Sequence, residues 1–92
     1  MKEIYFSKDT GKLIDEEGII YLGKRFDSVG TTGPISPSPE DALRDSRINL
    51  EIIAEKKGAT AYEVVASFTH FDTGNEYDSQ PYSAQLIALL YR

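Results

Sequence analysis

The chain has no cysteine, a single histidine and no apolar run long enough to cross a bilayer. The absence of cysteine excludes disulfides, thiolate metal ligands and thiol nucleophiles, and it leaves the redox compartment undetermined. Because His70 is the sole histidine, every general-base or metal-site proposal must use this residue or do without an imidazole. The start, Met1-Lys2-Glu3, lacks the pattern of a signal peptide. We therefore expect no membrane span and no thiol chemistry.

Positive charge is also scarce. The 92 residues include 10 Lys and Arg against 15 Asp and Glu, which gives a net charge of −5. Binding to nucleic-acid phosphates needs a concentrated basic patch, and the two basic pairs, Lys24-Arg25 and Lys56-Lys57, lie far apart and close to acidic residues. We therefore expect no nucleic-acid partner. The length and the 40% hydrophobic content are typical of a single soluble domain over residues 1–92.

The clearest local signal is a helix over residues 39–57. Ser38 is a good N-cap, Pro39 suits the first helical position, and two acidic residues follow where the helix dipole favours negative charge. At the other end, two lysines complement the dipole and Gly58 suits the left-handed position that ends a helix. The sequence therefore predicts both ends of this helix.

Alternating or continuous apolar residues predict strands over residues 2–6, 19–26, 61–71 and 82–91. Residues 13–14 are expected to pair back on the first strand, residues 27–37 to form a loop, and residues 72–81 to connect the last two strands as a hairpin. Four residues of the third strand are expected on one face: Tyr62, Val64, Ala66 and Phe68. The expected fold class is α+β, with one helix packed on a small antiparallel sheet. Its β-α-β-β core spans residues 19–92, and residues 1–18 add an N-terminal hairpin or strand.

Two isoleucines of the predicted helix suggest an interaction surface. A helical wheel places Ile48 and Ile52 roughly opposite the expected core face. That core face consists of Ala42, Leu43, Ser46, Leu50, Ile53 and Ala54. Either the N-terminal segment folds across the isoleucine pair, or the pair is a subunit interface. Tyr77 and Tyr82, near the last hairpin, are further candidates for a binding surface.

These observations favour a non-enzymatic domain that self-associates as a homo-oligomer or binds a protein partner. The alternative is a ligand- or metal-ion-binding module at the last hairpin. There, His70 is followed by three carboxylates, which would suit loose binding of a divalent cation. The carboxylates are those of Asp72, Glu76 and Asp78. The same segment also fits an ordinary solvated loop.

Features that would indicate catalysis are weak. The run Gly30-Thr31-Thr32-Gly33 precedes the helix but lacks the Gly-Lys-Ser/Thr of a phosphate-binding loop. The paired carboxylates lie in turns or at the helix start, where local structure already explains them. We therefore expect no catalytic residues and no cofactor.

Four segments carry a resemblance to a known family: Ser38-Pro39-Glu40, Ala54-Glu55-Lys56-Lys57-Gly58-Ala59, Tyr62, and Leu90-Tyr91-Arg92 at the end of the last strand. Over about residues 19–92 the chain resembles the YhcN-like family of small enterobacterial stress proteins. Its strand–helix–strand–strand order is also similar to that of YbjQ-type domains, which have been proposed to bind metals and form oligomers.

The resemblance implies a non-enzymatic role in bacterial stress or envelope response, with no catalytic residues to carry over. YbjQ-type metal ligands cannot be carried over to a chain with one histidine and no cysteine. Family members usually begin with a signal peptide. The implied location is periplasmic if a signal peptide has been removed, and cytoplasmic otherwise.

Overall fold

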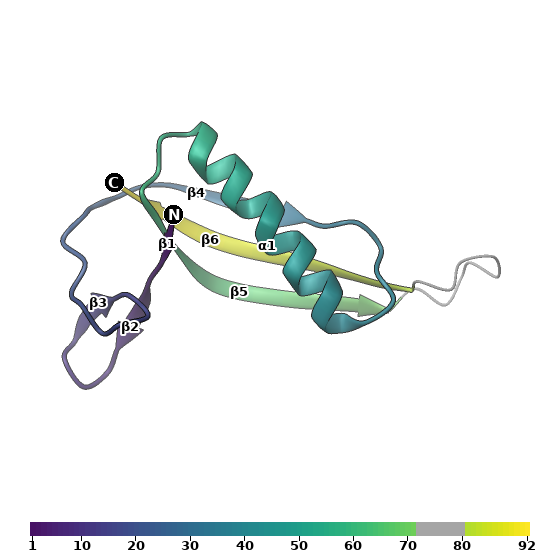
Figure 1. The fold of residues 1–92 in the computed structure, drawn as a ribbon, viewed down its shortest axis with the longest axis horizontal. Coiled ribbons are helices and arrows are strands. Elements are labelled where there is room, and N and C mark those ends of the chain that lie inside the picture. Colours follow the sequence, from purple (N-terminus) through teal and green to yellow (C-terminus); the bar gives the residue numbers. More distant parts are fainter. Residues whose placement is uncertain (72–80) are drawn as a thin grey trace.

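The computed structural model describes residues 1–71 and 81–92, and these form one helix packed on one side of a sheet (Figure 1). The elements, in chain order, are β1 (Lys2–Glu3), β2 (Tyr5–Ser7), β3 (Lys12–Ile14), β4 (Arg25–Thr32), α1 (Pro39–Lys56), β5 (Ala61–Phe71) and β6 (Tyr82–Tyr91). The α+β class and the β-α-β-β order of the core, β4-α1-β5-β6, are confirmed.

The main sheet has the strand order β1-β5-β6-β4. Strand β6 pairs antiparallel with both β4 and β5, whereas β1 runs parallel to β5 and pairs only at Lys2 with Ala61 and at Glu3 with Tyr62. The sheet is therefore mixed rather than purely antiparallel as expected. The expected N-terminal hairpin is confirmed, since β2 and β3 pair through Phe6 and Leu13.

Both predicted ends of the helix are confirmed. The Ser38 side chain accepts a hydrogen bond from the Asp41 backbone N–H at 3.2 Å, and Pro39 begins the helix. Gly58 has φ of 83°, and its N–H donates to the Glu55 carbonyl at 3.0 Å, which satisfies one of the free carbonyls at the helix end.

The helix lies over one side of the sheet (Figure 1), and the predicted core-face residues Ala42, Ser46, Leu50 and Ala54 are buried. Leu50 and Ala54 are fully buried against Leu86 and Leu90 of the central strand β6. Burial of a leucine side chain contributes about 1.5–3 kcal/mol, so these contacts are a main source of stability. Ser46 is also buried, and its hydroxyl lies 3.3 Å from the hydroxyl of Thr31 in β4.

The prediction for the first core strand was wrong. Residues 19–24 are outside the strands, with the Leu22 side chain 88% exposed, and the strand instead spans Arg25–Thr32. The run Gly30-Thr31-Thr32 is thus part of β4 and not of a loop. The strand pairs along β6, with Val29 and Thr31 on the helix side, and Phe26 forms a bulge that interrupts the alternation.

A second bulge changes the faces of β5. Val64 pairs with Ala88 and Ala66 pairs with Ile87, so Val65 is an extra residue on β5. Directly opposed residues of an antiparallel pair point to the same side of a sheet. Val64 therefore faces the helix, whereas Ala66 faces away from it. Phe68 pairs with Gln85 on the same far side, so the expectation that Ala66 and Phe68 share a face with Tyr62 was wrong.

The N-cap gives a direct test of how the helix is stabilised. Ser38→Ala removes the hydrogen bond to Asp41 and should lower the free energy of unfolding by about 1 kcal/mol in urea titrations. Ser38→Asn is the matched control, because asparagine accepts the same bond and should retain most of the stability. Equal losses in the two variants would contradict a capping role.

Candidate functional site

The first candidate surface is the helix stripe, defined as Ile48 and Ile52 on the outward side of α1. Their side chains are 50% and 47% exposed. The N-terminal segment does not fold across them, because Ile4 is fully buried with Ala61 and Tyr91 on the opposite side of the sheet. Of the two alternatives for the stripe, covering by the N-terminal segment was therefore wrong. The stripe is left uncovered by the described part of the chain.

The second candidate surface is the open face, which is the side of β4, β5 and β6 turned away from α1. Its residues, placed by the pairing register, include Ser28, Gly30, Thr32, Glu63, Ala66, Phe68, His70, Ser83, Gln85, Ile87 and Leu89. Glu63, opposite Leu89, is a charged residue among them. Phe68 is 47% exposed, while Ile87 and Leu89 are half-buried by their neighbours. An antiparallel sheet face turned to water is ordinarily polar, so the apolar members of this face need an explanation.

One end of the open face is covered by the N-terminal hairpin. Ile4, Leu13 and Tyr21 pack against Tyr91, whose ring meets that of Tyr21 edge-on at 6.1 Å between centroids. The Tyr21 hydroxyl lies 2.6 Å from the Thr60 hydroxyl, which fixes the segment after the hairpin. Beside this contact lies a cavity of about 520 Å³, here called the hairpin groove. Its main lining residues are Phe6, Leu13, Ile20, Leu22, Glu63 and Tyr91.

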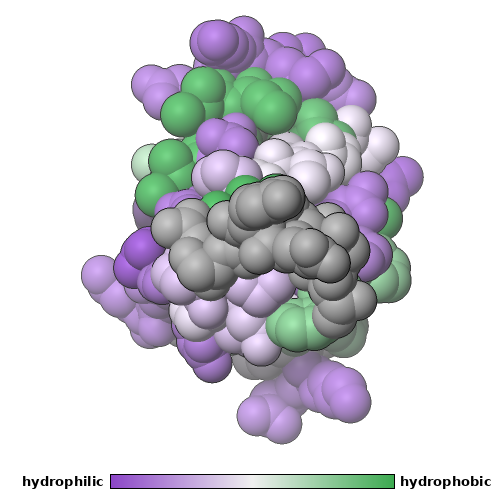
Figure 2. All heavy atoms as spheres, turned by 90° about the vertical axis from the view of Figure 1, so that its right-hand side faces the viewer, coloured by the Kyte–Doolittle hydropathy of each residue, from purple (hydrophilic) through white to green (hydrophobic). Residues whose placement is uncertain are grey.

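Hydrophobic surface is patchy at the other end of the molecule. Figure 2 looks from the side opposite the hairpin, and its largest green hydrophobic area lies in the upper part of the view, with hydrophilic purple side chains above it. The helix stripe and the open face lie on opposite sides of the sheet and are therefore separate surfaces.

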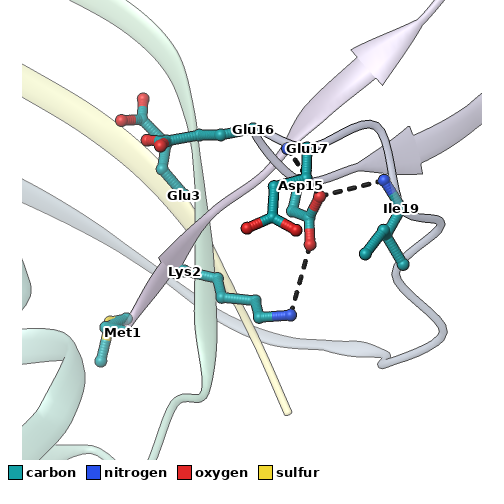
Figure 3. Close-up of a pocket in the computed structure, with 7 residues that line it drawn as sticks. All are labelled: Met1, Lys2, Glu3, Asp15, Glu16, Glu17 and Ile19. Carbon is teal, nitrogen blue, oxygen red and sulfur yellow. Dashed lines mark hydrogen bonds and ion pairs between the residues drawn. The ribbon is translucent and has the colours of Figure 1, made fainter.

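A third candidate is a cavity of about 230 Å³ at the acidic turn after β3 (Figure 3). Asp15 accepts hydrogen bonds from the backbone N–H groups of Ile19 at 3.0 Å and Glu17 at 2.9 Å, and from the Lys2 ammonium at 3.3 Å. The bond from Ile19 is the largest cause that holds the pKa of Asp15 below its usual value. Through these bonds, in which both carboxylate oxygens take part, Asp15 ties the turn to β1.

A tyrosine–carboxylate network joins the helix to the sheet. The buried Tyr62 hydroxyl donates to Glu51 at 2.7 Å, and beside it Arg47 pairs with Glu3 of β1 at 3.1 Å. Burial, and then the hydrogen bond to Glu51, raises the pKa of Tyr62 well above its usual value. Tyr91 donates to Glu63 at 2.9 Å; burial, followed by this bond, raises the pKa of Tyr91 to about 12.

Two further groups have shifted pKa values. The pKa of Tyr5 is raised by burial and by Glu3, and the pKa of Asp27 is lowered by its hydrogen bond to Lys57 at 2.8 Å.

The residues of the proposed metal set are only partly described. His70 is exposed on the open face and pairs with Ser83, whereas Asp72, Glu76 and Asp78 lie outside the described residues. Within the described ranges, no three His, Asp or Glu side chains are placed to hold a metal ion. The metal site stays a prediction.

Of the two tyrosines predicted at an interface, Tyr77 also lies outside the described residues. Tyr82 is half-buried on the helix side, where its ring is 5.1 Å from that of Phe71 and its backbone N–H donates to the Ser36 carbonyl at 3.1 Å. Its role at an interface stays a prediction. The hairpin groove was not identified from the sequence, and the bulge at Val65 conceals which residues of β5 share a side with Ile87 and Leu89.

The chain matches no family model, no curated protein and no solved structure. The helix of the described region is not apolar enough to cross a membrane.

The Asp15 contacts predict a specific pH dependence. The pKa of Asp15 is lower in the folded chain than in the unfolded chain, so its ionised form stabilises the fold above about pH 4, and this contribution is lost as the pH falls through the folded pKa. Asp15→Asn keeps the oxygen that accepts from the backbone but removes the charge. We expect a lower urea midpoint for the variant at pH 7 and equal midpoints at about pH 2.

Glu16→Gln, at an exposed position of the same cavity, serves as the control and should leave the midpoint close to that of the unmodified chain. A difference between Asp15→Asn and the unmodified chain that persists unchanged in acid would contradict the assignment.

Proposed function

We propose that the chain is a non-enzymatic α+β domain that acts by binding another protein chain, either a second copy or a different protein. The observation that carries the proposal is the helix stripe. Ile48 and Ile52 lie one turn apart, each about half exposed, on a helix whose other apolar residues are turned to the sheet. Single exposed apolar residues are common on proteins, whereas an adjacent pair marks an interaction surface.

The free sheet edges are the other surfaces available to a partner. β1 pairs with only two residues of β5, so the described β5 beyond Tyr62 has an open edge, as does the outer side of β4. Open edges can accept an added strand. However, Val65 and Phe26 place a bulge on each of these outer strands, and bulges discourage strand addition. We therefore assign the binding to faces rather than to edges.

The polar groups support a non-enzymatic role. No buried side-chain nitrogen or oxygen of the described residues lacks a hydrogen-bond partner. The pKa of a catalytic acid or base is commonly shifted toward the pH at which the enzyme works. The hydrogen bonds that Tyr62 and Tyr91 donate to glutamates, and those that Asp15 and Asp27 accept from lysines, join different elements of the fold and are typical of structural contacts.

The resemblance to YhcN-like proteins supports an association role in bacterial stress or envelope response, and this biological setting stays a prediction. A cation-binding module at His70 also stays a prediction, since the carboxylates that it requires are outside the described residues.

The helix stripe can be tested by changing its polarity. Ile48→Lys/Ile52→Lys places two charges on the stripe, and self-association followed by sedimentation velocity should weaken at least tenfold, which corresponds to about 1.4 kcal/mol. The urea midpoint of the monomer should stay unchanged, because both side chains already contact water.

Glu40→Gln/Glu55→Gln is the matched control, since it changes the net charge by the same amount at two exposed helix positions. Its self-association should equal that of the unmodified chain. The proposal would be contradicted if the unmodified chain is a monomer and the Ile48→Lys/Ile52→Lys variant has a lower free energy of unfolding.

A further inference from the structure

The hairpin groove gathers exposed apolar side chains around one cavity. The hairpin β2–β3 stands beside one end of the main sheet (Figure 1), and the groove is lined by residues of both parts. Phe6, Ile20 and Leu22 line it from the hairpin and the segment that follows, and they are 59%, 42% and 88% exposed. Single exposed apolar residues are common, whereas several around one cavity mark a binding surface.

The lining of the groove is held in place by contacts within the chain. The Tyr21 backbone N–H donates to the Leu13 carbonyl at 2.9 Å, and the Tyr21 hydroxyl lies 2.6 Å from that of Thr60. Ile4, just before β2, is fully buried in a cluster with Tyr91. The cavity of about 520 Å³ falls within the range of about 300–1,000 Å³ typical of small-molecule sites, which are usually preformed and mostly apolar.

The charge of the groove is set by Glu63, which is half-buried in its lining. Its carboxylate accepts a hydrogen bond from the Tyr91 hydroxyl at 2.9 Å, and a carboxylate has further acceptor positions for a ligand. No Lys or Arg of the described residues forms an ion pair with Glu63, and residues 72–80 contain neither type. Lys12 also lines the groove, but it is exposed, so water and salt screen its charge. A half-buried carboxylate without a cation favours a positively charged ligand.

The aromatic residues of the groove indicate which kind of cation fits. Phe6, Tyr21 and Tyr91 all belong to the lining, and aromatic faces attract organic ammonium groups. A metal ion such as Ca²⁺ requires six or more oxygen ligands, whereas Glu63 is the sole carboxylate among the described lining residues. Apolar side chains, aromatic rings and one carboxylate together suit an ammonium group on an apolar body.

We propose that the hairpin groove binds a small organic ammonium ion. The ammonium group pairs with Glu63 beside the ring of Tyr91, and the apolar body of the ligand covers Phe6, Ile20 and Leu22. This site is separate from the helix stripe and does not depend on the binding of another protein chain.

Three indole compounds of similar size and different charge test the proposal. Tryptamine carries an ammonium group, 3-ethylindole is neutral and indole-3-propionate carries a carboxylate. The chain has no tryptophan, so the fluorescence anisotropy of the indole reports the ligand alone. Tryptamine should bind at least about tenfold more tightly than indole-3-propionate, with 3-ethylindole between them, because the added interaction is a charge-assisted hydrogen bond.

Glu63→Gln tests the charge directly. Glutamine still accepts a hydrogen bond from Tyr91 but has no charge, so the preference for tryptamine over 3-ethylindole should disappear while 3-ethylindole binds as before. Glu55→Gln, at an exposed helix position, changes the net charge equally and should keep the preference.

Ile20→Ser tests the apolar lining without removing a buried residue. It should weaken the binding of all three compounds, because each places its indole against this side chain. Ile19→Ser is the matched control, since Ile19 is an exposed neighbour that lines the cavity at the acidic turn instead and should leave binding unchanged.

Three results would each overturn the inference. They are no binding of tryptamine at millimolar concentration, equal affinities for tryptamine and indole-3-propionate, and tryptamine binding that neither Glu63→Gln nor Ile20→Ser weakens. Because the helix stripe is unchanged in these variants, any of these results would leave the proposed function standing.

Discussion

A single helix can cover only one side of the sheet, and this constraint determines most of the molecule. Helix α1 buries Leu50 and Ala54 against Leu86 and Leu90, so the helix-side residues of β6 form the core. The alternate residues of β6, including Ile87 and Leu89, have no second helix to cover them among residues 1–71 and 81–92. The N-terminal hairpin covers the end of this far side at Tyr91, and the remainder is the open face. The surfaces for a partner thus follow from incomplete covering of the sheet.

The helix was predictable because its signals are local. Ser38, Pro39 and Gly58 act through hydrogen bonds and backbone angles within a few residues of each end, so the sequence around them contains the whole interaction. The inward side of the helix was predictable for a similar reason, since the helical period places Leu50 and Ala54 on one side whatever they contact.

The sheet was less predictable because its faces depend on pairing. Residues 19–26 are more apolar than residues 25–32, yet β4 forms where Val29 and Thr31 can meet β6 and Thr31 can reach Ser46. The bulge at Val65 reverses the side of every later residue of β5. One inserted residue leaves no compositional trace, so the β5 residues of the open face could not be derived from alternation. The helix stripe and the far side of β6 follow from the sequence, whereas the β4 and β5 residues of the open face required the register.

The central claim is that chains associate through the helix stripe. The most direct measurement is a dilution series of methyl NMR spectra. The account predicts that the methyl signals of Ile48 and Ile52 on the helix stripe shift with concentration, while those of buried Leu50 and Leu86 stay fixed. Spectra that do not depend on concentration, or shifts confined to residues outside the helix stripe, would contradict it.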